Sequence, residues 1–223
     1  MNRECQVVFL GKCEYQYSNQ LQKEFLRQRI EGTVPDTLIL VQHYPVITMG
    51  RKGNIANIVA NREVLNREGI TVHQVDRGGD VTYHGPGQIV AYPILDLNWH
   101  GKDVHRVLFR YEEVIIEMLS VYGLKGSRLS GYPGVWVGNE KICAIGIGIR
   151  QWVTYHGFAL NVNTNLDHFG YIKPCGLSDK GVTSMHRLLN QELDDNEVME
   201  NMIGVFGRVF GLEMKIQECN HRL

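Results

Sequence analysis

The sequence predicts an α+β fold, in which a mixed β-sheet with packed helices forms one domain. Short β-branched and aliphatic segments cluster in the middle of the chain, and amphipathic segments lie between and after them. No low-complexity tract, repeat or linker interrupts this order over the 223 residues. We therefore expect a single domain over residues 1–223, with a C-terminal helical segment over about residues 190–223.

Runs of β-branched and aliphatic residues predict the strands in the first half of the chain. They cover residues 6–10, 37–41, 42–50 (a broken strand), 72–75 and 89–95. Two helices are predicted between these strands. The first covers residues 15–30, with apolar side chains along one side, and the second is short, with Asn61 as its N-cap and Gly69 at its end.

The clearest helix of the sequence covers residues 103–122. Asp103 can cap its first turn, apolar residues recur at spacings of three and four, and Gly123 ends it. Strands follow over residues 134–137, 141–149 and 157–162, with Gly138 and Asn139 as a hairpin turn between the first two. A last helix is predicted over residues 196–210.

The composition excludes several classes of protein. A formal net charge of −1 and a pI of about 6.8 argue against binding to nucleic acid or to an anionic membrane surface. No apolar run reaches the length of a membrane span, and residues 1–11 lack the apolar core of a signal peptide. The five cysteines are odd in number and form no C-x-x-C pair, so we expect neither a disulfide framework nor a zinc site. These features favour the cytoplasm.

A dense glycine stretch over residues 77–93 is the main candidate for a binding site. Gly78, Gly79, Gly85 and Gly87 lie within eleven residues, and glycine allows φ > 0 and a close approach of the backbone to a ligand. Polar side chains lie between these glycines. We expect an unusual loop whose N–H groups are free to face a bound molecule, anchored by the strand that follows it.

Cys175 is the candidate nucleophile because Pro174 and Gly176 place it on a local bend among polar residues. From the local sequence alone, the alternative is that Cys175 is an exposed cysteine without a catalytic role. Cys143, by contrast, lies in an apolar strand, where a small buried cysteine is the ordinary interpretation.

A thiol needs a cation or a base nearby to ionise at neutral pH, and Lys141 is the candidate cation. It begins a strand in which Ala144, Gly146 and Gly148 form a strip of small residues, where a ligand or another backbone can lie close. Strict alternation places Lys141 on the opposite face from that strip. A shared pocket therefore requires a β-bulge or a twist at the strand end, and a solvated strand-end lysine is the alternative.

His84 and His156 are the histidines nearest to glycine-rich sequence, and either could assist a cysteine. A protease-like Cys–His pair is therefore a rival, although no protease signature surrounds Cys175. The glycine stretch matches neither G-x-x-x-x-G-K-[ST] nor G-x-G-x-x-G, so a nucleotide site has only glycine content in its favour.

Five stretches, taken together, resemble the lipoyl(octanoyl) transferase family. They are HYPVITMGR (43–51), RGGDVTYHGPGQIVAYPI (77–94), GVWVGNEKICAIGI (134–147), HGFALNV (156–162) and KPCG (173–176). They occur in the family's order and cover most of the chain up to about Met185. Tyr44 stands where the family's HPP pattern has a proline, and residues beyond about Leu188 match nothing.

The resemblance implies the fold of the biotin/lipoate ligase and transferase group, and a single catalytic domain. It implies that Cys175 is the acyl-thioester nucleophile and that Lys141 lowers its pKa. Residues implied to line the substrate channel are Arg77, Gly78, Gly79, Asp80, Val81, Thr82, Tyr83, His84, Ala144, Ile145, Gly146, Gly157, Phe158 and Ala159.

The reaction implied is transfer of an octanoyl or lipoyl group from the thioester of octanoyl-acyl carrier protein to a lysine of a lipoyl domain. The acceptors implied are the lipoyl domains of 2-oxoacid dehydrogenase complexes and the glycine cleavage H protein. Thioester exchange followed by amide formation needs no ATP, no metal and no other cofactor. Two rivals remain: an ATP-dependent lipoate or biotin protein ligase, and a non-catalytic module that binds lipoyl domains or acyl carrier protein.

Overall fold

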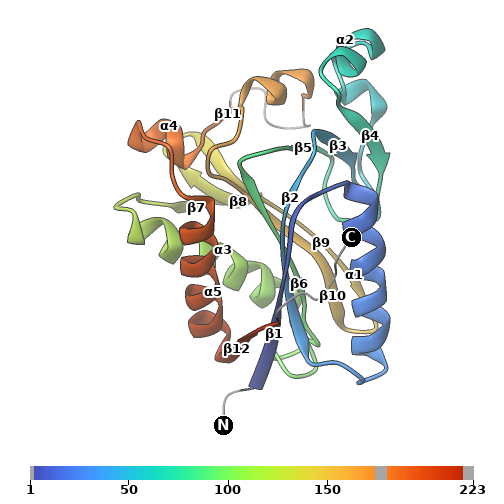
Figure 1. Ribbon diagram of the computed structural model, residues 1–223, viewed down its shortest axis with the longest axis vertical. Coiled ribbons are helices and arrows are strands. Elements are labelled where there is room, and N and C mark those ends of the chain that lie inside the picture. The colour runs from blue at the N-terminus through green and yellow to red at the C-terminus, as the bar shows by residue number, and fades with distance from the viewer. Residues whose placement is uncertain (1–2, 174–179, 218–223) are drawn as a thin grey trace.

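The structure, a computed structural model, describes residues 3–173 and 180–217. In Figure 1 one helix covers one face of a large sheet, two helices cover the other, and a small sheet with a short helix lies at one end. These helices are, in turn, α1 (Tyr15–Ile30), α3 (Val104–Val121), α5 (Asp195–Phe210) and α2 (Arg62–Arg67). The predicted α+β architecture, a mixed sheet with packed helices, is confirmed.

The large sheet has nine strands among the described residues. Their order across the sheet is β12 (Leu212–Ile216), β1 (Arg3–Cys13), β2 (Asp36–His43), β6 (Gln88–Ile94), β10 (Val153–Asn161), β9 (Glu140–Arg150), β8 (Tyr132–Val137) and β7 (Ser127–Leu129), with β11 (Gly181–Val182) paired to β9. The pairs β1–β12, β1–β2 and β9–β11 are parallel, and the others are antiparallel. The small sheet consists of β4 (Thr71–Gln74), β3 (Val46–Met49) and β5 (Val81–His84).

The central strands are buried on both faces, because helices pack on both sides of the large sheet. In β2, Leu38 and Leu40 belong to the core under α3 and α5, whereas Ile39 and Val41 belong to the core under α1. This explains why the central strands are continuously apolar in the sequence rather than alternating.

Helix boundaries follow the capping residues that the sequence indicates. Asp103 accepts hydrogen bonds from the backbone N–H groups of His105 and Arg106, at 2.9 and 3.2 Å, and begins α3. Asn61 accepts one from the N–H of Val64 at 2.9 Å and begins α2. Both predicted caps, and the bounds predicted for α1, are confirmed.

Several short elements were not predicted. One of them, β5, lies inside the glycine stretch, so that this stretch is not one continuous loop. The others are β7, β11, β12, α4 (Met185–Leu189) and the 3₁₀ helices η1 (Ile55–Asn57) and η2 (Asp167–Tyr171). Elements this short carry too few residues to show a period in the sequence.

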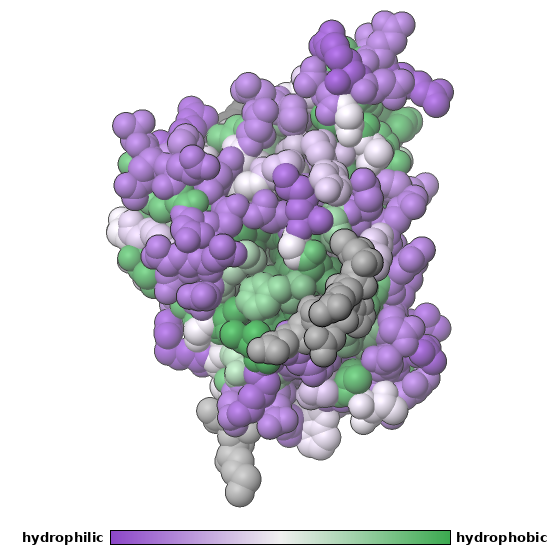
Figure 2. All heavy atoms as spheres, in the orientation of Figure 1, coloured by the Kyte–Doolittle hydropathy of each residue, from purple (hydrophilic) through white to green (hydrophobic). Residues whose placement is uncertain are grey.

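Hydrophilic side chains cover most of the face seen in Figure 2, and hydrophobic ones gather in the hollow between α5 and α1, where β1 lies. Among the residues the structure describes, no helix has both the length and the apolar character needed to cross a membrane.

Candidate active site

A cavity of about 650 Å³ lies between the large and the small sheet. Thirteen of the fourteen residues expected in the substrate channel line it, and so does Lys141. The thirteen are Arg77, Gly78, Gly79, Asp80, Val81, Thr82, His84, Ala144, Ile145, Gly146, Gly157, Phe158 and Ala159. Segments far apart in the sequence therefore meet around one hollow.

A β-bulge in β9 brings Lys141 to this cavity. In the pairing of β8 with β9, Trp136 lies opposite Lys141 but Val135 lies opposite Cys143, so Ile142 is an extra residue. Lys141, Ala144 and Gly146 consequently line the same cavity, whereas Cys143 is fully buried outside it. The bulge that a shared pocket requires is present.

The surroundings of Lys141 hold its amine in place without neutralising its charge. Nζ donates a hydrogen bond to the Pro133 carbonyl at 3.2 Å and lies 4.8 Å from the centre of the Trp136 ring, in a cation–π contact. Gly134 leaves room for the lysine stem, because a Cβ there would lie 3.5 Å from Cε and 2.5 Å from the Cys143 carbonyl oxygen. Burial lowers the pKa of Lys141. It has no ion-pair partner among the described residues, so its charge is available to an anion in the cavity.

The first part of the glycine stretch is held between two strands. Backbone N–H groups of Gly50, Arg51 and Lys52 donate to the carbonyls of Asp80, Arg77 and Gly79, at 3.0–3.1 Å. On the other side the N–H of Gly78 donates to the Ile147 carbonyl of β9 at 2.8 Å. These contacts fix residues 77–80 as one wall of the cavity.

The expectation that the N–H groups of this stretch are free is wrong for two of its glycines. The N–H of Gly78 is used in the contact with β9, and that of Gly87 donates to Gln42 Oε1 at 2.9 Å. Gly87 has φ = +76°, and a Cβ there would lie 2.6 Å from the Asn163 backbone. Glycine is therefore required at position 87, because the Asn163 backbone packs directly against it.

Arg77 connects the glycine wall to the small sheet. Its guanidinium donates to the Thr48 carbonyl and hydroxyl at 2.7 and 2.9 Å, and to the Gly78 carbonyl at 3.0 Å. The side chain is 8 % exposed, and burial lowers its pKa. The aliphatic part of Arg77 lies over Gly146, where a Cβ would be 3.3 Å from Cδ and 2.9 Å from the Gly78 carbonyl oxygen.

The strip of small residues in β9 therefore has two uses. At Gly146 it admits the backbone of the glycine wall, and at Gly148 it admits the ring of Tyr155, whose Cζ would lie 2.4 Å from a Cβ. Only Ala144 and Gly146, nearer to Lys141, line the cavity. The expectation that another backbone lies close to this strip is confirmed.

Tyr83 is the one expected channel residue that does not line the cavity. Its ring is 1 % exposed, and its hydroxyl is 2.7 Å from His168 Nδ1. Thr82 and His84, on either side of it in β5, line the cavity, whereas the Tyr83 ring packs against His168 and Phe169 of η2.

His84 is unsuited to activate a thiol. Its Nδ1 is 2.7 Å from Gln88 Oε1, and burial together with His43 lowers its pKa to about 3. It therefore stays neutral at pH 7. The His84 ring stacks on Tyr15, at 6.4 Å between centroids, and meets His43 edge-on at 5.9 Å.

His156 lines the cavity in an unusual backbone conformation. The φ angle of His156 is +54°, although the residue lies within strand β10. Pro93 of the neighbouring strand β6 lies close by and has no N–H to donate to it. The backbone N–H of His156 instead donates to Gln22 Oε1 of α1 at 2.9 Å. Nε2 is 2.9 Å from Asp76 Oδ1, and this hydrogen bond lowers the pKa of Asp76. Burial lowers the pKa of His156.

Three residues of the site were not predicted: Asp76, which contacts His156, and Tyr15 and Tyr92, which line the cavity. The sequence offered two signals for them: the Asp76 carboxylate lies directly before Arg77, and Tyr92 lies within the apolar run of β6. A carboxylate or a tyrosine at such a position is too common to indicate a site on its own.

Cys175 lies outside the described residues, but both flanks of its segment reach the cavity. Ile172, before it, and Val182, after it, line the cavity. Val182 pairs with Lys141 in the parallel contact of β11 with β9, and the N–H of Lys173 donates to the Asn57 carbonyl at 2.7 Å.

The described cysteines are poor nucleophiles. Cys5 and Cys143 are fully buried, and burial raises the pKa of both thiols. Burial also raises the pKa of Cys13, to about 11. The interpretation of Cys143 as a small buried core residue is confirmed.

Within residues 3–173 and 180–217, no three His, Cys, Asp or Glu side chains are grouped closely enough to hold a metal ion.

This chain matches a known protein family. Residues 14–207 match the model of the lipoyl protein ligase A/B catalytic domain. Among curated relatives, an octanoyltransferase from Caldicellulosiruptor saccharolyticus is 49 % identical over 211 residues, which cover 94 % of this chain and 90 % of the relative. An octanoyltransferase from Desulforamulus reducens is 47 % identical, with 94 % and 92 % covered.

Solved structures with the same fold are lower in identity. A putative lipoate protein ligase from T. acidophilum with bound lipoic acid has a TM-score of 0.77 at 16 % identity, covering 96 % of this chain and 89 % of that one. A biotin protein ligase from Aquifex aeolicus has a TM-score of 0.52 at 10 % identity, covering 92 % and 69 %. The predicted likeness to the biotin/lipoate ligase and transferase fold is confirmed.

Proposed function

The chain belongs to the lipoyl protein ligase A/B catalytic domain family, and from this we propose that it is an octanoyltransferase acting through a Cys175 thioester. The donor is the thioester of octanoyl-acyl carrier protein. The acceptor is a lysine of a lipoyl domain, in a 2-oxoacid dehydrogenase complex or in the glycine cleavage H protein. The identity of 44–49 % to proteins named octanoyltransferase, over at least nine-tenths of each chain, supports the reaction class.

The observation that carries the mechanism is the position of Lys141. It is a cation without an ion-pair partner among the described residues, and it lies on the wall of a cavity that is otherwise rich in small and apolar side chains. An unpaired thiolate in such a place is costly, and a lysine cation beside it would stabilise it.

Chain connectivity supports Cys175 as that thiolate. Cys175 is three residues after Ile172, and three residues span at most about 11 Å. On the other side, Val182 is already paired with Lys141. The cavity is therefore within reach of the Cys175 sulfur, whereas Cys143 faces away from it.

The proposed reaction has two acyl transfers. The Cys175 thiolate attacks the carbonyl carbon of the donor thioester and the donor C–S bond breaks. The departing donor thiolate takes a proton from the Lys141 ammonium, which leaves the Lys141 amine neutral. The neutral ε-amine of the acceptor lysine then attacks the Cys175 thioester. An amide bond forms, the C–S bond to Cys175 breaks, and Lys141 takes the proton that the amine loses and restores the ion pair with the sulfur.

The first transfer exchanges one thioester for another, and the second yields a more stable amide, so the sequence of steps needs no ATP. We place the reaction in the cytoplasm, where a reducing environment keeps Cys175 as a free thiol.

Intact-protein mass spectrometry tests the proposal. Incubation with octanoyl-acyl carrier protein, without nucleotide, should add one octanoyl group that hydroxylamine removes and that peptide mapping assigns to Cys175. Cys175→Ala should abolish the adduct, and Cys13→Ala, the matched control at a half-exposed cysteine, should keep it. An adduct on another residue would refute the nucleophile, and use of free octanoate with ATP in preference to the thioester would favour a ligase.

A further inference from the structure

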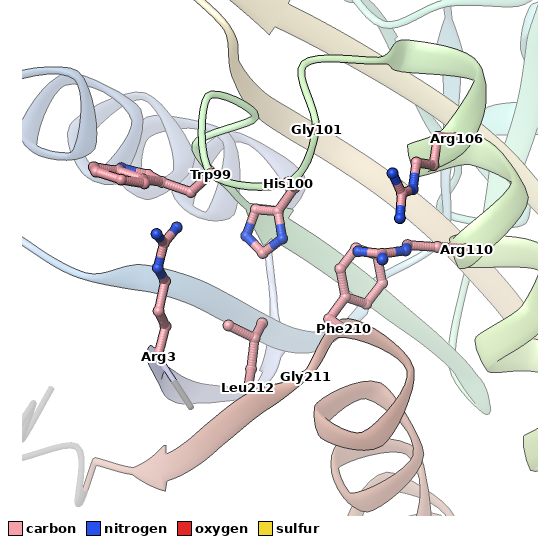
Figure 3. A pocket seen from close by; sticks show the side chains of 9 residues that line it. All are labelled: Arg3, Trp99, His100, Gly101, Arg106, Arg110, Phe210, Gly211 and Leu212. Carbon is pink, nitrogen blue, oxygen red and sulfur yellow. The ribbon is translucent and has the colours of Figure 1, made fainter. Parts of the chain in front are cut away.

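A second pocket, of about 430 Å³, lies apart from the acyl cavity (Figure 3). The two hollows share no lining residue, and α3 lies between them, with Leu108 lining the cavity and Arg106 and Arg110 lining the pocket. The pocket is formed by the start of β1, the turn before α3, α3 itself and the junction of α5 with β12. The nine lining residues are Arg3, Trp99, His100, Gly101, Arg106, Arg110, Phe210, Gly211 and Leu212.

The pocket carries three positive charges and no lining carboxylate. The side chains of Arg3, Arg106 and Arg110 have no hydrogen bond or ion pair with any residue that the structure describes, whereas those of Arg29 and Arg128 each pair with two carboxylates. Arg106 and Arg110 are one helical turn apart, a spacing at which like charges repel. Burial and the charge of Arg106 together lower the pKa of Arg110. An anion between them would relieve this repulsion.

Aromatic rings hold two of the arginines in position. The Arg3 guanidinium lies 4.0 Å from the centre of the Trp99 ring, and that of Arg110 lies 5.4 Å from the centre of the Phe210 ring. Gly101, with φ = +91°, brings its backbone to the third, since a Cβ there would lie 3.2 Å from Arg106 Nη1. The cations are thus positioned before any ligand binds.

His100 gives the pocket a buried polar group. The residue is 7 % exposed, and Nε2 lies 2.7 Å from Asp36 Oδ2, while Asp36 Oδ1 accepts a hydrogen bond from Arg29 Nε at 2.8 Å. The other ring nitrogen, Nδ1, has no partner within the described part of the chain. Figure 3 shows the imidazole between Arg3 on one side and Arg106 and Arg110 on the other.

From these contacts we propose that this pocket binds a small molecule bearing a phosphate group, as a second ligand site separate from the acyl cavity. Two guanidiniums one turn apart match the oxygens of a phosphate, with charge-assisted hydrogen bonds as the main contacts. A hollow of about 430 Å³ with a buried histidine in its wall fits a small ligand better than the flat surface of a protein. Trp99, which is 59 % exposed, offers a surface on which the rest of such a ligand can stack.

Isothermal titration calorimetry with inorganic pyrophosphate and with AMP tests this site on the full-length protein. Both should bind with one-to-one stoichiometry, and tighter binding of AMP would identify a nucleotide rather than a bare phosphate group as the preferred class. Arg106→Gln and Arg110→Gln should each weaken binding about tenfold or more, the loss expected for one charge-assisted contact. Arg62→Gln, at an exposed arginine of α2 outside the pocket, is the control and should bind as the unaltered protein does.

Three outcomes would overturn the proposal: no saturable binding of either probe at millimolar concentration, binding unchanged in Arg110→Gln, or binding lost in Lys52→Met, which alters the acyl cavity instead. Circular dichroism of each variant shows whether a loss reflects the site or the fold. Because binding of these probes is independent of octanoyl transfer, its failure leaves the proposed function intact.

Discussion

Replacement of Lys141 by methionine tests the central element of the proposed mechanism. Methionine keeps the length and apolar character of the side chain but removes the cation on the cavity wall. We expect Cys175 to lose its activating partner, because Lys141 lines the cavity and is paired with Val182 of β11, just beyond residues 174–179. Lys141→Arg keeps the charge but cannot release a proton near neutral pH.

The size of the effect follows from electrostatics at short range. At a separation of about 5 Å and an effective dielectric constant of about 20, two opposite charges attract by about 3 kcal/mol, or about two pKa units. Loss of this attraction should raise the pKa of the Cys175 thiol toward its ordinary value. The thiolate fraction at pH 7 should then fall by about tenfold or more.

The assay is the rate of iodoacetamide labelling of Cys175 against pH, followed by peptide mass. The midpoint should move to higher pH in Lys141→Met and stay near that of the unaltered protein in Lys141→Arg, while octanoyl transfer falls in both. Lys52→Met is the matched control, since Lys52 lines another part of the same cavity. An unchanged labelling profile in Lys141→Met would show that Lys141 is not the activating group.

Further predictions concern stability and the shape of the cavity. Gly146→Ala should lower the free energy of unfolding by about 1–3 kcal/mol and reduce kcat/KM, because its Cβ would lie 2.9 Å from the Gly78 carbonyl oxygen; urea unfolding and the transfer assay measure both. Gly204→Ala, within α5 and with no atom within 4 Å of the new Cβ, should instead stabilise by about 0.5–1 kcal/mol, and a decrease would contradict the packing described. Asp103→Ala should cost about 1 kcal/mol in the same experiment, and a value near zero would mean that the two cap hydrogen bonds contribute nothing. Below pH 6.5 the unfolded chain protonates His43 and His84, whereas in the folded protein burial lowers their pKa values to about 4 and about 3, so stability should fall between pH 6.5 and pH 4 by about 1.4 kcal/mol per histidine per pH unit. His43→Gln should remove about half of this dependence, and an unchanged slope would show that His43 protonates in the folded state.

Much of the fold could be predicted because its signals are local. The bounds of α1, the cap and apolar face of α3, and the hairpin between β8 and β9 each depend on residues within a few positions of one another. The need for a bulge near Lys141 also followed from local alternation. In a regular strand, Lys141 and the small residues of β9 would point to opposite faces of the sheet.

Other features depend on contacts between distant segments. The positive φ of His156 arises beside Pro93 and α1, and its side chain meets Asp76, which is 80 residues away in the sequence. The amides of Gly78 and Gly87 are used by β9 and by Gln42, so glycine content alone could not show which N–H groups remain open. Tyr83 was predicted to line the channel together with its neighbours, because the glycines around β5 gave no sequence signal for that strand.

The pairing of β1 with β12 has a consequence for how the chain is made. Arg3 lies opposite Leu212 and Val7 opposite Ile216, so the first strand acquires its outer neighbour only after residues 212–216 have left the ribosome. Until then one edge of β1 is open to pairing with other chains, and contacts of such long sequence separation form slowly. C-terminal truncation before Leu212 should therefore appear first as aggregation during synthesis, before any effect on chemistry in the cavity.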